Sequence, residues 1–219
     1  MLEIKPRLTR PKAILFDWDN TLVDTWPCIG RATNITLEAM GHKTWSPAEV
    51  KERVAGSLRD MFPVLFGDRW EEAREIFYRA FEEVHLEVLV AAPGAEEMLR
   101  EAANSGIYLG VVSNKTGKYL RTEADHLGWT SFFGRLVGAQ DAARDKPAAD
   151  PIHLALLQSG IAAGPEVWFV GDAPIDVLCG RTAGCSTIFV GNVPEAVTAQ
   201  PDHIVADCKA LAGLVRASL

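Results

Sequence analysis

Three features are scarce in this 219-residue sequence: basic tracts, long apolar runs and paired cysteines. With 22 Lys and Arg against 29 Asp and Glu, the net charge is −7, which argues against a nucleic-acid groove or an anionic membrane face. The apolar runs fall well short of the ~20 residues that span a bilayer. Four cysteines without a CxxC pair indicate free thiols, and residues 1–12 lack the apolar centre of a signal peptide. We therefore expect a cytoplasmic protein without nucleic-acid or membrane partners.

Short apolar runs alternate with helical patterns through most of the chain. The runs are rich in Val, Ile, Leu and Phe, which is typical of buried strands, and the helical patterns end before glycines. The expected strands are residues 13–16, 107–112, 136–139, 167–170, 187–190 and 204–205. The expected helices are residues 95–104, 116–127, 151–159, 175–183 and 209–217. This alternation predicts an α/β fold, a Rossmann-like parallel sheet with helices on both faces.

Between Thr25 and Pro93 the pattern is helical, and no strand is expected. The segment Ser46-Pro47-Ala48-Glu49 has the form of a capping box, with proline at the first helical position. Apolar residues keep helical spacing from residue 70 to residue 88. We therefore predict a core domain of residues 1–24 and 92–219, and an all-helical cap domain of residues 25–91 inserted after the first strand.

Two acids, Asp17 and Asp19, follow the first strand. Carboxylates two residues apart in an extended segment point the same way, which is costly unless a cation lies beside them. Mg²⁺ is a suitable cation because it prefers oxygen ligands. The alternative is a turn in which these side chains cap backbone groups.

Polar residues also follow three later strands. Ser113 and Asn114 could donate to a phosphate or cap a helix, and Lys146 lies in a loop stiffened by prolines. Asp172 and Asp176 flank a strand-to-helix turn, where they could share one site or cap the helix. Because ligands of open parallel sheets bind at the carboxyl ends of the strands, the four groups together predict one site.

The segments DWDNT, SN, KP and GDxxxD resemble the four motifs of the haloacid dehalogenase superfamily. The helical insert resembles the first cap type of that superfamily, found in phosphoglycolate phosphatases and β-phosphoglucomutases. The resemblance implies a Mg²⁺-dependent phosphatase that cleaves a small phosphorylated metabolite through an aspartyl-phosphate. One departure is that Ala173 and Pro174 stand where many relatives have Ser or Thr after Gly-Asp.

The resemblance also implies roles for single residues. Asp17 is implied to be the nucleophile, and Asp19 the general acid and base. Mg²⁺ would bind the Asp17 and Asp172 carboxylates and the Asp19 carbonyl, with Asp176 ligating or orienting this site. The phosphoryl oxygens would be held by Ser113, Asn114 and Lys146.

A turn of the cap is expected to reach the substrate through Gly56, Ser57 and Arg59. Arg59 could pair with a substrate carboxylate, or it could be a surface arginine beside a capping serine. Two other functions stay open: a sugar-phosphate mutase with the same nucleophile, and a phosphoacceptor domain resembling a response-regulator receiver. A dehalogenase is disfavoured because Asp19 supplies an acid that those enzymes lack. The expected state is a monomer or a homodimer.

Overall fold

The computed structural model describes residues 8–54, 58–193 and 199–219. The chain divides into two compact units. One, here called the α/β unit, consists of Met1–Val23 and Ala91–Leu219. The other, here called the helical unit, is the continuous segment Asp24–Val90. Within the described ranges, no helix is both long and apolar enough to cross a membrane.

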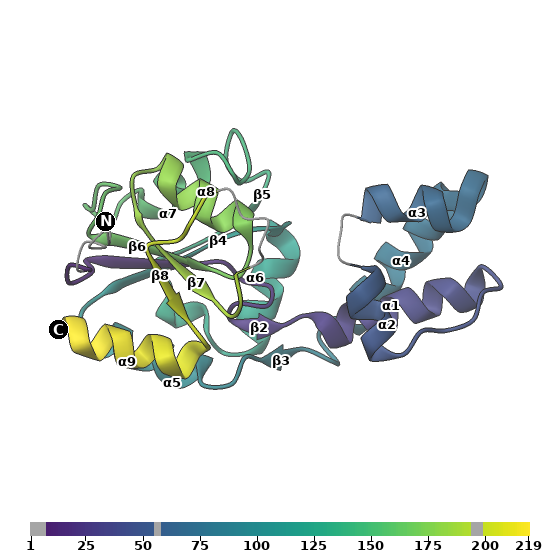
Figure 1. Cartoon of the computed structure of the whole chain (residues 1–219), viewed down its shortest axis with the longest axis horizontal. Coiled ribbons are helices and arrows are strands. Elements are labelled where there is room, and N and C mark those ends of the chain that lie inside the picture. Colours follow the sequence, from purple (N-terminus) through teal and green to yellow (C-terminus); the bar gives the residue numbers. More distant parts are fainter. Residues whose placement is uncertain (1–7, 55–57, 194–198) are drawn as a thin grey trace, which may run out of the picture. The chain divides into compact units, whose positions relative to one another are not determined.

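The α/β unit is built on a parallel sheet in the order β5-β4-β1-β6-β7-β8 (Figure 1). Its strands are β1 (Ala13–Phe16), β4 (Tyr108–Thr116), β5 (Arg135–Ala139), β6 (Val167–Gly171), β7 (Ser186–Val190) and β8 (His203–Val205). All four residues of β1 are fully buried, because this strand has a neighbour on each side and covered faces. The prediction of an α/β fold with a parallel sheet is confirmed.

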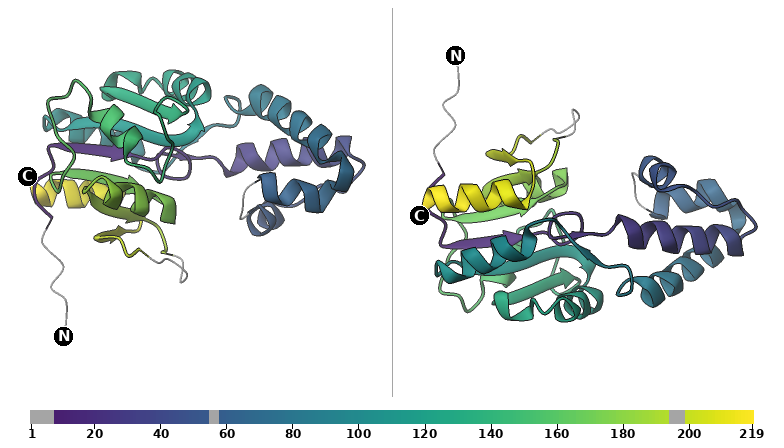
Figure 2. Two further views of the ribbon diagram at one scale, coloured as in Figure 1. Left: turned by 90° about the horizontal axis from the view of Figure 1, so that it is seen from above. Right: turned by 90° about the horizontal axis from the view of Figure 1, so that it is seen from below.

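Helices cover both faces of the sheet. They are α5 (Ala95–Asn104), α6 (Gly117–His126), α7 (Asp150–Leu156), α8 (Pro174–Thr182) and α9 (Cys208–Ser218), with a short 3₁₀ helix at Thr130–Phe132. The views in Figure 2 show α7 and α8 over one face and α5 and α9 over the other. Ala13, Leu15 and Phe169 belong to a buried apolar cluster with residues of α7 and α8. Burial on both faces explains why the strands are continuous apolar runs.

Two element boundaries differ from the sequence-based prediction by more than one residue. β4 continues past Val112 to Thr116, which pairs with Ala139 after an irregularity in the register. The polar residues after Val112 end the apolar run, but the strand itself continues. α7 ends at Leu156, before the predicted residue 159, because Leu157 is extended and Gln158 adopts a left-handed backbone with φ of 76°.

The helical unit contains α1 (Trp26–Ala39), α2 (Pro47–Arg53), α3 (Leu58–Phe66), a 3₁₀ helix at Gly67–Arg69 and α4 (Trp70–Val84). The predicted capping box is present, since Ser46 Oγ accepts from Glu49 N at 3.3 Å and Ser46 N donates to Glu49 Oε2 at 2.9 Å. Phe62 and Phe77 pack edge to face in its core, with ring centroids 5.8 Å apart.

A short strand contradicts the expectation that residues 25–93 contain none. β3 (Val90–Ala91) pairs with β2 (Val23–Asp24) in a separate two-stranded sheet. A strand of two residues is too short to show the alternation that identifies strands in a sequence.

Candidate active site

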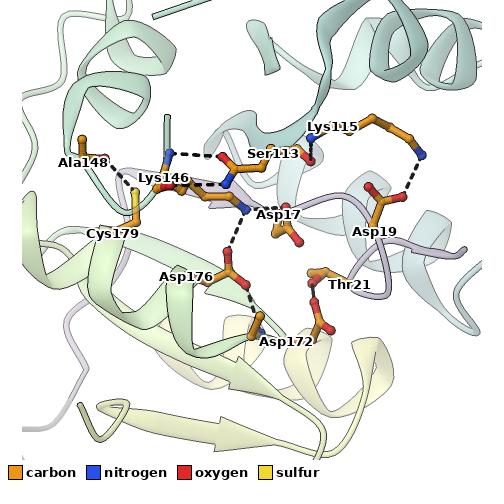
Figure 3. Close-up of polar contacts among 12 residues, drawn as sticks. Asp17, Asp19, Thr21, Ser113, Lys115, Lys146, Ala148, Asp172, Asp176 and Cys179 are labelled. Carbon is orange, nitrogen blue, oxygen red and sulfur yellow. Dashed lines mark hydrogen bonds and ion pairs between the residues drawn. The ribbon is translucent and has the colours of Figure 1, made fainter. Parts of the chain in front are cut away.

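The carboxyl ends of three adjacent strands carry the candidate site (Figure 3). Asp17 directly follows β1, and its N–H donates to Val170 O at 2.8 Å, so the ladder with β6 extends to this residue. Ser113 lies on β4, and Asp172 follows β6. The central strand and its two neighbours thus bring residues from distant parts of the chain to one edge of the sheet.

Lys146 lies at the centre of the site. Its Nζ donates to Asp17 Oδ1 at 2.6 Å and to Asp176 Oδ1 at 2.7 Å. The lysine is 6% exposed and Asp17 is 7% exposed. A buried charge needs partners of opposite sign, and this lysine has two. The structure therefore brings together three of the predicted site residues in direct contact.

Asn114 fixes the loop that carries Lys146. Asn114 Nδ2 donates to Lys146 O at 3.2 Å, and Asn114 Oδ1 accepts from Lys146 N at 3.1 Å. On the next turn of the loop, Cys179 Sγ donates to Ala148 O at 3.1 Å. The asparagine that the sequence suggested as a phosphate ligand is thus bonded to the backbone of the lysine.

Asp17, Asp172 and Asp176 form an acidic cluster in which one carboxylate oxygen of each lies within 4.8 Å of the others. Asp172 Oδ1 accepts from Thr21 Oγ1 at 2.9 Å. Asp176 Oδ2 accepts from Ala173 N at 3.0 Å in the first turn of α8. Hydrogen bonds thus orient two of the three acids, and the ion pair with Lys146 orients the third.

Gly171 is required by the position of Asp176. A Cβ atom at residue 171 would lie 2.3 Å from Asp176 Oδ2, closer than nonbonded atoms approach. The absence of a side chain therefore allows the helix N-terminus and its carboxylate to lie against the end of β6.

Burial and mutual repulsion of the acids in the cluster favour their protonated forms or the binding of a further cation. Burial raises the pKa of Asp17 to about 7 against the pull of Lys146, with further increases from Asp176 and Asp172. Burial, followed by the charge of Asp176, raises the pKa of Asp172 to about 6. Burial opposes the charge on Lys146, but Asp17 and Asp176 together raise its pKa above the ordinary value.

The donor set fits a Mg²⁺ ion. Three carboxylates at short separation face a single lysine, so one positive charge does not balance the cluster. Carboxylate oxygens are hard ligands, which Mg²⁺ prefers. A divalent ion would offset the burial and the mutual repulsion that raise the two pKa values.

The raised pKa of Asp17 predicts a pH dependence of stability in metal-free protein. Between the unfolded value near 4 and the folded value of about 7, the native state binds more protons than the unfolded state, so the free energy of unfolding falls as pH rises. A tenfold difference in proton affinity corresponds to about 1.4 kcal/mol. We expect the melting temperature of Asp17→Asn, relative to wild type, to increase from pH 5 to pH 7 in EDTA and then level off. A difference in melting temperature that stays constant from pH 5 to pH 7 would contradict a raised pKa of Asp17.

A second polar network, which the sequence analysis did not predict, surrounds Asp19. Lys115 Nζ donates to Asp19 Oδ1 and to Glu123 Oε2, each at 2.7 Å, and Trp18 Nε1 also donates to Glu123 Oε2 at 2.7 Å. Lys115 could have been singled out in the sequence, because it directly follows the Ser-Asn pair of β4. Nothing in the sequence marks Glu123 on α6, because a glutamate in an amphipathic helix is usually exposed.

The remaining predicted residues divide into two groups. Ser113 is buried on β4, where its Oγ accepts from Lys115 N at 3.1 Å. Gly56 and Ser57 lie outside the described residues. Arg59 falls in α3, and its side chain also lies outside the described part of the chain.

A family model described as "Haloacid dehalogenase-like hydrolase" matches residues 14–190. The chain belongs to this family. The match begins in β1 and ends in β7, so it includes the acidic cluster and both lysine networks. The superfamily expected from the four motifs is confirmed.

Other members of the haloacid dehalogenase-like hydrolases are similar over most of their length. The N-acetylmuramic acid 6-phosphate phosphatase of Pseudomonas aeruginosa is 33% identical, over 83% of this chain and 82% of that protein. The phosphoglycolate phosphatase of Chromobacterium violaceum is 28% identical, over 82% and 85%. The crystal structure of a Had-superfamily hydrolase from Ehrlichia chaffeensis is 28% identical, with a TM-score of 0.68 over 96% of this chain and 98% of that one.

Proposed function

We propose that this haloacid dehalogenase-like hydrolase is a Mg²⁺-dependent phosphatase that cleaves a small phosphate monoester through a phosphorylated Asp17. The observation that carries the proposal is the buried Asp17 carboxylate at the end of the central strand, 2.6 Å from Lys146 Nζ and inside the acidic cluster. A carboxylate can accept a phosphoryl group and so divide one difficult step into two.

In the first step, a carboxylate oxygen of Asp17 forms a bond to phosphorus while the bond from phosphorus to the ester oxygen breaks. The Asp19 carboxyl group gives its proton to that leaving oxygen, which departs as an alcohol. Lys146 offsets the repulsion between the Asp17 carboxylate and the anionic substrate. Positioning and charge neutralisation are the main requirements of phosphoryl transfer.

In the second step, a water molecule attacks the phosphorus of the aspartyl-phosphate. Asp19, now a carboxylate, takes a proton from this water, the bond between Asp17 and phosphorus breaks, and inorganic phosphate leaves. Asp19 is protonated again and Asp17 is a carboxylate, so the cycle can repeat. One group acts as acid and then as base, as microscopic reversibility requires.

Mg²⁺ would be held by the carboxylates of Asp17 and Asp172 and the carbonyl of Asp19, with Asp176 beside them. When bound, it would neutralise charge on the phosphoryl oxygens. Ser113 and Lys146 would bind those oxygens. Asn114 would position Lys146 through its two hydrogen bonds to the lysine backbone.

The helical unit would serve as the cap that selects the substrate, with boundaries near residues 25 and 91. Relatives named for phosphoglycolate and for N-acetylmuramic acid 6-phosphate support a small phosphate monoester as the substrate class. Within the cap, Gly56, Ser57 and Arg59 stay the proposed substrate-contacting residues, and Arg59 would pair with a carboxylate of the substrate.

The proposal predicts strict metal dependence. Purified protein is expected to release inorganic phosphate from p-nitrophenyl phosphate with Mg²⁺, and to lose this activity in excess EDTA, because the acidic cluster repels an anionic ester without the ion. Readdition of Mg²⁺ is expected to restore the rate, and Asp172→Ala is expected to raise the Mg²⁺ concentration needed. Full activity in EDTA would contradict the metal assignment. The protein should also be assayed on a panel of phosphate esters. Conversion of a sugar phosphate to its isomer without net release of phosphate would show that the protein is a mutase and not a phosphatase.

A further inference from the structure

Lys115 is a buried cation that the proposed chemistry does not use. Its side chain is only 5% exposed, and it extends from β4 to two carboxylates on different elements, Asp19 after β1 and Glu123 on α6. Burial opposes the charged form, but Asp19 and Glu123 raise its pKa above the ordinary value. Lys115 therefore stays charged between two carboxylates.

The other end of this network is rigid. Glu123 has a side chain 1% exposed and accepts from both Lys115 and the indole N–H of Trp18. Trp18 is fully buried, edge to face against Trp129 and Phe133 with centroid distances of 5.9 and 6.4 Å. Since Trp18 precedes Asp19 in the chain, the hydrogen bonds close a ring through the segment that carries the acid.

The two buried lysines serve different acids. Lys146 contacts Asp17 and Asp176, whereas Lys115 contacts Asp19, as the dashed lines in Figure 3 show. A lysine needed only to neutralise Glu123 would not have to reach the Asp19 carboxylate, whose side chain is 29% exposed. The ion pair at 2.7 Å restricts rotation of the one carboxylate that must exchange protons with substrate and water.

We propose that Lys115, held by Glu123 and Trp18, is a positioning residue that orients the Asp19 carboxylate for both proton transfers. This inference rests on the proposed function and adds to it a second lysine, acting on the acid-base group while the first acts on the nucleophile. A misplacement of about 1 Å in a catalytic group can cost a hundredfold in rate. Removal of Lys115 should therefore reduce proton transfer while leaving Asp17 and the acidic cluster in place.

The test is a double-mutant cycle with Lys115→Met and Asp19→Asn, assayed with Mg²⁺ on an alkyl phosphate and on p-nitrophenyl phosphate. We expect Lys115→Met to lower kcat on the alkyl phosphate about tenfold to a hundredfold with little change in KM. With p-nitrophenyl phosphate, whose leaving group needs no proton, we expect the phosphoenzyme to form and then accumulate. In the Asp19→Asn background, Lys115→Met should change kcat by less than about threefold, because the group it orients is already gone.

Two further variants control for folding. Lys115→Met leaves Glu123 buried without this lysine. Lys115→Met/Glu123→Gln removes that buried charge as well, and the amide oxygen can still accept from Trp18. Lys12→Met removes an exposed lysine paired with Glu166 at the opposite end of β1, and it should keep wild-type rates. If Lys115→Met is unstable, the same cycle is measured with Lys115→Met/Glu123→Gln in place of Lys115→Met and with Glu123→Gln in place of the wild type.

The outcomes separate this inference from the proposed function. Losses that multiply across the cycle, or a rate of phosphoenzyme formation that falls equally for both esters, would overturn the positioning role while leaving the phosphatase in place. Wild-type protein inactive on both esters would overturn the phosphatase and this inference together.

Discussion

Replacement of Asp17 by asparagine is expected to abolish turnover, with a loss on the order of 10⁴–10⁶ in kcat, as for the removal of other catalytic nucleophiles. An amide cannot accept the phosphoryl group as the carboxylate does, and the substitution also removes one oxygen of the acidic cluster. No phosphoenzyme should form. Acid-quenched samples taken within the first turnover of p-nitrophenyl phosphate, followed by mass spectrometry, measure this directly.

Stability provides the control for the Asp17→Asn experiment. The variant removes a buried carboxylate whose pKa is raised to about 7, so the metal-free protein should be at least as stable as wild type at pH 8. Loss of activity in a protein of equal or higher melting temperature cannot be attributed to unfolding. Asp125→Asn, an exposed acid on α6, is the matched substitution and should keep the wild-type rate. A phosphoenzyme in the Asp17→Asn sample would show that the nucleophile is another residue.

Replacement of Lys146 by methionine is expected to cause the largest loss of stability. The lysine is buried between Asp17 and Asp176, and removal of one partner of a buried ion pair costs about 3–5 kcal/mol because charge is left uncompensated. Protonation of Asp17 can limit this cost below pH 7, so the destabilisation should be greatest at pH 8. Urea denaturation in EDTA at pH 6 and pH 8 measures both values.

Two comparisons make the Lys146 result specific. Lys12→Met, which breaks an exposed ion pair, should change the free energy of unfolding by less than about 1 kcal/mol. Lys146→Met/Asp17→Asn should regain part of the lost stability, because one of the two unpaired carboxylates is gone. If Lys146→Met were no less stable than Lys12→Met, the buried ion pairs of the site would not contribute to stability as the geometry implies.

The sheet could be predicted from the sequence because its strands are buried on both faces. Residues 13–16 and 167–170 read as strands from apolar content alone, and all of them are buried. The same criterion failed in β4, because the strand continues beyond its last apolar residue. β4 continues through Ser113, Asn114 and Lys115, whose polarity reflects the site and not the end of the strand.

The acids of the site and Lys146 could be placed from the rule that ligands bind where parallel strands end. Their contacts could not, because they depend on how loops approach one another. Asn114 illustrates the difference: its position at the end of the apolar run suggested a ligand, while its amide bonds to the backbone of Lys146. Glu123 was beyond prediction, since only the packing of α6 against the segment containing Trp18 shows that this glutamate is buried.

The position of β1 in the sheet determines when the candidate site at the carboxyl ends of the strands can form during synthesis. β1 leaves the ribosome early, but its partner β4 follows the helical unit, and its other partner β6 is made later still. The helical unit is one continuous segment, so its own contacts can form while β1 waits unpaired. Pairing that closes such long loops is slow relative to local folding. A nascent chain is therefore without its nucleophile site until Asp176 has been translated and the sheet has closed around its first strand.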